Sequence, residues 1–187
     1  ILAALVFIRK VTATTTISRV TKEYLDEGRL HVLQDKEIPP YATVFRIHGP
    51  FLFGAADKID DLMQQIPELP PIVILRLRNM TAIDATGLRA LEELADRVKA
   101  SGRRLILCGA REQPAQLMRQ SEFEQHVGAE NICANVTEAL ARAGAVFPQI
   151  AAEAPSVQKW GRRSTDRESP EITDGKPPVA NAATSRD

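Results

Sequence analysis

The chain of 187 residues carries 24 basic and 24 acidic side chains, and 44% of its residues are hydrophobic. That length accommodates one domain of ordinary size with extensions, and the apolar fraction is sufficient for a packed core. Because the charges balance, the chain has no overall field that would attract nucleic acid or an anionic membrane surface, and we expect no nucleic-acid partner.

The cysteines and histidines show no spacing that is typical of a metal site. Cys108 and Cys133 each fall in a short apolar stretch without a Cys or His neighbour at ligand spacing, which predicts reduced residues of the core. His31, His48 and His126 share no recurring spacing and no arrangement with a nucleophile. We expect neither a metal nor another cofactor.

Residues 1–11 begin with an apolar run that ends abruptly at Arg9 and Lys10. The run is too short to span a hydrocarbon core, which takes about 20 residues in a helix, but basic residues commonly follow a spanning helix on its cytoplasmic side. The favoured interpretation is the end of a transmembrane helix. The alternative is a short amphipathic or disordered lead-in, whereas a signal peptide fits poorly because no basic region precedes the run.

Residues 12–28 are predicted to form a linker helix that ends at Gly28. Its apolar side chains recur at spacings near three and four, as on one face of a helix. They are Ile17, Val20, Tyr24 and Leu25. The domain that follows is predicted to occupy residues 29–147.

Two short β-type stretches open the domain, at residues 30–34 and 43–48, with the turn-forming sequence around Pro39 between them. Residues 57–66 then carry apolar side chains at i, i+3, i+4 and i+7, which predicts an amphipathic covering helix. The aliphatic run that starts at Ile72 is typical of a strand buried on both faces, so we expect residues 72–77 to form the central strand.

The second half of the domain repeats the order of strand, turn and helix. An apolar stripe predicts a helix over residues 87–100, and residues 105–108 follow as a short strand. Pro114 suits the first turn of another helix, and residues 131–133 are predicted to be a brief last strand. Asn135 gives the closing helix a start that resembles a capping box.

From Pro148 onward, prolines are mixed with Ser, Thr, Ala and charged residues, and no apolar periodicity continues. A segment of this composition cannot bury enough apolar surface to offset the entropy lost when a chain becomes ordered. We predict a disordered tail over residues 148–187.

Strands that alternate with helices predict an α/β fold with a central, mostly parallel sheet of about five strands and about four helices packed against it. In such sheets ligands and partners are usually met at the carboxyl ends of the strands. The stretch Asp84-Ala85-Thr86-Gly87 lies at one of these ends, between the central strand and the helix after it. It is therefore the candidate functional site.

A purely structural role can explain each polar or small residue of this stretch. Asp84 is a typical N-cap, Thr86 a first-turn residue, and Gly87 the space that a helix needs to approach a strand. A phosphate on Thr86 would also add roughly two negative charges at the positive end of the helix, which the helix tolerates while the surface changes for a partner. Thr86 is therefore a candidate regulatory site.

Signatures of common enzyme classes are missing from the sequence. No Gly-x-Gly-x-x-Gly follows a predicted strand, and the chain has no Gly-x-x-x-x-Gly-Lys-Ser/Thr loop for phosphates. It also has no Gly-x-Ser-x-Gly elbow with Asp and His partners. We expect a protein that is not an enzyme and has no catalytic residues.

Three stretches of the domain are distinctive when they are taken together. They are Ile83-Asp84-Ala85-Thr86-Gly87-Leu88, Gly49-Pro50-Phe51-Leu52-Phe53-Gly54-Ala55 and Leu105-Ile106-Leu107-Cys108-Gly109-Ala110. With them, the region from about Leu30 to Gly144 resembles a STAS domain, the fold of anti-sigma factor antagonists and of the cytoplasmic tails of SulP-family anion transporters. The second stretch and the start of the chain resemble the transporter branch.

The resemblance implies a cytoplasmic regulatory domain of a SulP-type transporter of sulfate or a related anion, on the cytoplasmic side of the cell membrane. The implied partners are the protein's own transmembrane domain, a cytosolic regulatory protein and a second copy in a homodimer. In this family the anion path lies in the membrane part. No residue of this chain is therefore implied to bind the transported anion.

A free-standing signalling module switched by phosphorylation is the alternative function. Thr86 matches the position that anti-sigma factor antagonists phosphorylate. Those regulators have the pattern Asp-Ser-Ser-Gly, whereas Ala85 and Thr86 leave this chain with one hydroxyl.

Nucleotide binding, suggested for some relatives, is a weaker alternative because the phosphate loop is missing. It would use the loops that follow the second predicted strand and the central strand. Residues of these loops are candidate contacts for a nucleotide or a protein partner. They are Phe53, Gly54, Asp84, Thr86 and Leu88.

Overall fold

The computed structural model describes residues 14–20, 37–52, 57–153 and 160, and they form a five-stranded sheet in the order β1-β2-β3-β4-β5. The strands are β1 Thr16–Arg19, β2 Ala42–Phe51, β3 Ile72–Ile83, β4 Arg104–Cys108 and β5 Ile132–Cys133. β1 is antiparallel to β2, and the other neighbours are parallel. The predicted α/β fold with a mostly parallel sheet is confirmed, and β3 is its central strand.

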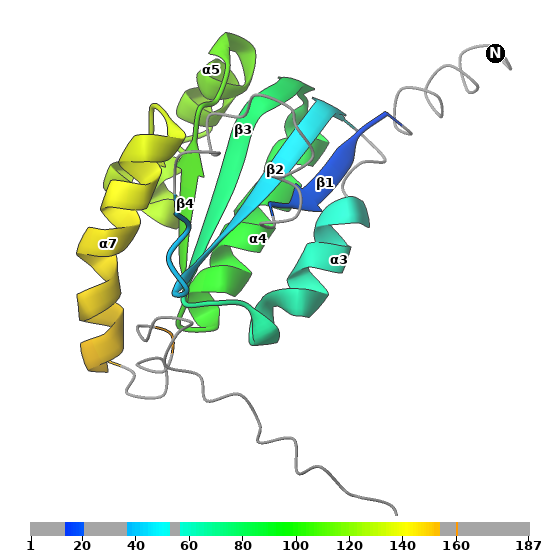
Figure 1. Cartoon of the computed structure of the whole chain (residues 1–187). Helices are drawn as coiled ribbons and strands as arrows, with labels where there is room; N and C mark the ends of the chain where they lie inside the picture. Colours follow the sequence, from blue (N-terminus) through cyan, green and yellow to red (C-terminus); the bar gives the residue numbers. More distant parts are fainter. Residues whose placement is uncertain (1–13, 21–36, 53–56, 154–159, 161–187) are drawn as a thin grey trace, which may run out of the picture.

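Helices cover both faces of the sheet, with α7 on one side and α3 and α4 on the other (Figure 1). The helices are α3 Asp57–Gln65, α4 Ala85–Ala100, α5 Glu112–Gln120, α6 Glu124–Val127 and α7 Val136–Glu153, with short 3-10 turns at Ile66–Glu68 and Ala129–Asn131. The four predicted helices of the domain are present. The four-residue α6 was not predicted, because its single turn is too short to show an apolar periodicity.

The apolar run of β3 contributes to two separate cores, as expected for a strand buried on both faces. Val73 and Leu75 belong to the core under α3 and α4, whereas Ile72 and Ile74 belong to the core under α7. All four side chains are fully buried. Because successive side chains point to opposite faces of a strand, an unbroken aliphatic run is what a covered central strand needs.

The prediction of a helix over residues 12–28 is wrong for Thr16–Arg19, which form β1. This strand pairs with β2 in a register that sets Thr16 opposite His48 and Arg19 opposite Phe45. The edge of β2 offers backbone donors and acceptors that a neighbouring strand satisfies, and this outweighs a weak apolar periodicity. The sheet therefore begins before the predicted boundary at residue 29. Residues 1–11 and the predicted strand over 30–34 lie outside the described residues.

The last helix also extends beyond its predicted end at residue 147. α7 continues to Glu153, with Pro148 inside it and Ile150 only 4% exposed. The ring of Phe147 stacks on Tyr41 with 4.2 Å between the ring centroids. These contacts with the core under α7 stabilise a segment whose composition alone predicted a disordered tail. Residues 154–159 and 161–187 lie outside the described part of the chain.

Within the described ranges, no helix has both the length and the apolar character that crossing a bilayer requires.

Replacing Ile150 by Ala tests the extension of α7. We expect the free energy of unfolding to fall by about 2–4 kcal/mol, because the substitution leaves a cavity in the core under α7. Gln149→Ala is the matched control, since Gln149 is exposed on the same turn, and its effect should stay within about 0.5 kcal/mol. Urea denaturation followed by circular dichroism measures both, and equal stabilities for the two variants would contradict the extension.

Candidate functional site

Asp84 joins the carboxyl end of β3 to α4 and caps the helix. Its backbone is extended, with φ −109° and ψ −178°, and its Oδ1 accepts a hydrogen bond of 2.8 Å from the amide of Gly87. The Leu88 amide donates to the carbonyl oxygen of Asp84 at 2.9 Å, which closes the first helical turn. The carboxylate thus satisfies an amide that the helix itself leaves without a partner. The predicted N-cap is confirmed.

Gly87 lies where α4 comes closest to the end of β2. A Cβ atom on Gly87 would lie 2.4 Å from the carbonyl oxygen of Phe51 and 3.1 Å from Cγ1 of Ile83. Phe51 is fully buried and lies opposite Ile83 in the ladder between β2 and β3, so its backbone has little room to move. The absence of a side chain therefore allows this approach. The predicted role of Gly87 as a spacer is confirmed.

The same end of β2 needs a second glycine. Gly49 has φ +89°, in the region that favours glycine, and a Cβ there would lie 2.9 Å from the carbonyl oxygen of Thr14. The hydroxyl of Thr15 donates a hydrogen bond to the carbonyl oxygen of Pro50 beside it. Segment 14–15 is thereby packed against the end of β2. The predicted contact residues Phe53 and Gly54 follow directly, outside the described residues.

Ala85 and Thr86 are the exposed residues of the first turn of α4, and they lie near the positive end of its dipole. Leu88, two residues later, is 6% exposed and belongs to the core between the sheet and helices α3 and α4. Its side chain therefore serves packing rather than the partner contact predicted for it. The exposed part of the candidate site consists of two small side chains.

Two side chains from the start of α5 hold the end of β3, and the sequence analysis missed both. Gln113 accepts a hydrogen bond of 3.0 Å from the amide of Ile83 and donates one of 2.9 Å to its carbonyl oxygen. Arg111 Nε donates to the carbonyl oxygen of Arg78 at 2.8 Å. Because β4 ends at Cys108 while β3 runs on, these side chains replace a strand partner. No local sequence pattern marks such a long-range pairing.

The Asp84–Gly87 turn forms the start of α4, and among the described residues no metal-binding cluster accompanies it. That part of the chain holds no group of three or more His, Cys, Asp or Glu side chains that could bind a metal. Nδ1 of His126 in α6 lies 2.9 Å from Oδ1 of Asp96, which follows Asp84 by twelve residues and lies in the second half of α4. Cys108 is buried and Cys133 half-buried, and both are free thiols.

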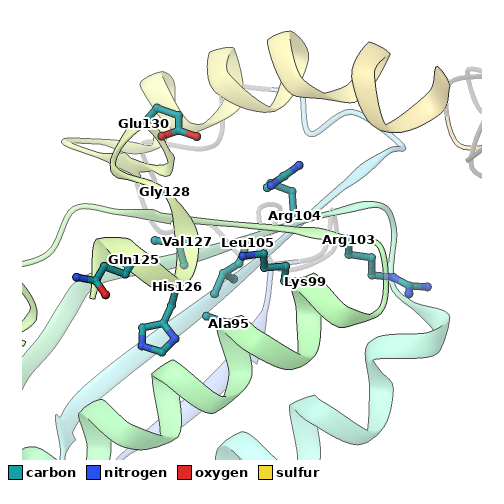
Figure 2. A pocket seen from close by; sticks show the side chains of 10 residues that line it. All are labelled: Ala95, Lys99, Arg103, Arg104, Leu105, Gln125, His126, Val127, Gly128 and Glu130. Atoms are coloured by element: carbon teal, nitrogen blue, oxygen red, sulfur yellow. The ribbon is translucent and has the colours of Figure 1, made fainter. Parts of the chain in front are cut away.

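A hollow of about 190 Å³ lies at the opposite, amino-terminal end of β4, between α4 and α6. Figure 2 shows the basic side chains of Lys99, Arg103 and Arg104 on one side of it and Glu130 on the other. Arg103 donates hydrogen bonds to the carbonyl oxygens of Leu69 and Pro67. This arginine thus joins loops of the fold, and the hollow is separate from the Asp84–Gly87 turn.

The chain matches the STAS domain family over residues 33–139, which is more than half of its length. The five-stranded, mostly parallel sheet with helices packed against it fits that assignment. The chain belongs to the STAS domain family. It is homologous to the STAS domains of SulP-type sulfate transporters, as three relatives indicate.

The candidate sulfate transporter YvdB of Bacillus subtilis (strain 168) is 23% identical over 132 residues, which are 70% of this chain and 23% of YvdB. The crystal structure of a sulfate transporter family protein from Wolinella succinogenes is 31% identical, with a TM-score of 0.57 over 62% of this chain and 94% of that one. The STAS domain of a SulP transporter from Vibrio cholerae is 29% identical, with a TM-score of 0.53 over 60% of this chain and 88% of that one.

The chain thus spans less than a quarter of the length of the curated relative it matches, and most of the length of the two solved structures. All three names describe transporters or their domains rather than enzymes. SulP-type anion transport is therefore the functional context of the relatives.

Replacing Gly87 by Ala tests the close approach at the turn. The new Cβ would overlap the carbonyl of Phe51, and we expect a loss of about 2–3 kcal/mol in the free energy of unfolding. Gly144→Ala is the matched control, because a Cβ on Gly144 in α7 would lie 3.6 Å from the Tyr41 hydroxyl, an ordinary contact. That control should gain about 0.5–1 kcal/mol, as expected when alanine replaces glycine in a helix. Losses of equal size would show that the turn has no special constraint.

Proposed function

We propose that this chain is the cytoplasmic regulatory domain of a SulP-type anion transporter, where it acts through contacts with the transmembrane domain or with a cytosolic partner. The homology to STAS domains of SulP transporters carries the proposal. The matched segment is 23% of YvdB, so most of that relative lies outside it. In this proposal the anion path lies in the part of the transporter outside the matched segment. This chain then has a regulatory role, with no catalytic residues.

The entrance of α4 is the contact surface in this proposal. The Asp84 cap, the spacer Gly87 and the hydrogen bonds from Gln113 hold the backbone in place on three sides. The small side chains of Ala85 and Thr86 leave that backbone open to close approach. A fixed and accessible surface at the carboxyl edge of a parallel sheet needs little reordering when a partner binds.

Thr86 is the residue of this surface whose side chain could be phosphorylated to regulate the domain. It occupies the second position of α4, and its exposed hydroxyl can accept a phosphoryl group from a kinase. The added charge, roughly −2, is favourable to the helix N-terminus but changes the surface that a partner meets. A phosphate at Thr86 would therefore alter binding without unfolding the domain.

The proposed partners are the transmembrane domain of the same transporter, a cytosolic regulatory protein and a second copy of the domain. The proposed location is the cytoplasmic side of the cell membrane. The alternative, a free-standing module switched by phosphorylation, would use the same exposed hydroxyl. A change at Thr86 should alter anion transport if the chain is a transporter domain, but not if it is a free-standing module.

Replacing Thr86 by Glu tests the proposal in a transporter that contains this chain. We expect anion uptake to change by about fivefold or more, the effect of a coupling free energy near 1 kcal/mol between the domain and the transport cycle. The isolated domain should keep its stability within about 0.5 kcal/mol, since a carboxylate is tolerated at a helix N-terminus. Radiolabelled anion uptake and urea denaturation measure the two effects.

Thr137→Glu is the control variant, because Thr137 is an exposed threonine in the first turn of α7. It introduces the same side chain at another helix start and should leave uptake unchanged. Uptake that is unaffected by Thr86→Glu would refute a regulatory role of the α4 entrance. A change in partner binding without a change in uptake would favour the free-standing module.

A further inference from the structure

A row of polar and thiol side chains crosses the sheet on the face that α7 partly covers. The strand registers set these residues side by side, one from each strand. They are Ser18, Arg46, Arg76, Cys108 and Cys133, in the order β1 to β5. Arg76 follows Ile72 and Ile74 at steps of two residues, and both belong to the core under α7. The row therefore lies directly beyond the apolar part of that face.

Arg76 is the member of this row whose environment needs an explanation. The residue is 6% exposed, and its Nη1 atom is buried without a hydrogen-bond partner. Among the described residues no carboxylate forms an ion pair with it. A buried charge is strongly unfavourable unless an opposite charge or hydrogen-bond acceptors compensate it. An arginine is never deprotonated in a protein, so it cannot escape this cost by becoming neutral.

The neighbours of Arg76 make its surroundings more positive. Burial lowers the pKa of Arg76, and the charges of Arg46 and Arg78 lower it further, while Cys108 has the opposite effect. Burial raises the pKa of the Cys108 thiol to about 12, so this thiol is neutral at pH 7 and offers no negative charge. Arg46 lies directly opposite Arg76 in the parallel ladder. A second guanidinium group thus lies beside Arg76, whose own Nη1 has no hydrogen-bond partner among the described residues.

Two other partly buried arginines of the domain, Arg103 and Arg142, have acceptors. Arg103 donates to the carbonyl oxygens of Leu69 and Pro67, and Nε of Arg142 donates to the side-chain oxygen of Asn131 at 2.9 Å. The buried Nη1 of Arg76 has no such acceptor among the described residues.

We propose that Arg76 and Arg46 form a binding site for a small oxyanion on the α7 face of the sheet. The planar guanidinium fork matches the oxygens of phosphate or sulfate, and charge-assisted hydrogen bonds would compensate the buried Nη1. Arg46 and Ser18 are half-buried, and they connect the site to the surface along the row. The site lies on the opposite face from α4, and the proposal is independent of Thr86.

Titration calorimetry of the full 187-residue chain with inorganic phosphate, at constant ionic strength in a chloride buffer, tests the site. We expect saturable binding of one phosphate per chain, with affinity at least tenfold weaker in Arg76→Met. Arg76→Lys keeps the charge but loses the fork, so its affinity should be intermediate. Arg104→Met is the control, because Arg104 is a half-buried arginine at the other end of the same sheet, and it should bind as the original chain does.

Stability without phosphate gives a second readout. Arg76→Met should unfold at the same temperature as the original chain or higher, because it removes an uncompensated buried charge and keeps a side chain of similar length. In the original chain, phosphate should raise the unfolding temperature, and this rise should be lost in Arg76→Met. Absence of phosphate binding by the original chain, equal binding by Arg76→Met, or a large loss of stability in that variant would each overturn the proposal.

Discussion

The approach of α4 to the end of β2 is the constraint on which the rest of the candidate site depends. Gly87 sits against the carbonyl oxygen of Phe51 at a distance that leaves no room for a Cβ atom. This contact fixes the angle at which the helix leaves the sheet, and the Asp84 cap fixes the turn before it. The first turn of α4 is consequently held from within the fold, while its outer side chains face solvent. Such an arrangement presents a surface whose shape does not depend on a partner.

The two faces of the sheet differ at the residues that lie beyond their separate apolar cores. On the α3 and α4 side, the carboxyl end of β3 leads into the exposed, small side chains of Ala85 and Thr86, next to the Asp84 carboxylate. On the α7 side, the row through Arg46 and Arg76 is positively charged and partly closed. Small exposed side chains allow close contact with a protein, whereas buried guanidinium groups suit an anion. The two sites can therefore act separately on one domain.

The sequence predicted those features that depend on short-range patterns. The aliphatic run at Ile72, the cap at Asp84 and the spacer at Gly87 all follow from local periodicity or from the chemistry of a single residue. The missed features depend on contacts between distant segments. Strand β1 forms because the edge of β2 is available, and the hydrogen bonds between Gln113 and Ile83 form because β4 is shorter than β3. The end of α7 was missed for the same reason, since the core contact of Ile150 outweighs a tail-like composition.

Hydrogen exchange at the start of α4 tests most directly whether the domain acts through this surface. The exchange of amides in residues 85–90 would be compared between the isolated domain and a full-length transporter that contains it. Contact with a partner at the α4 entrance predicts slower exchange there in the transporter, while the exposed face of α7 exchanges equally in both. Equal exchange at residues 85–90 in the two proteins would contradict the account.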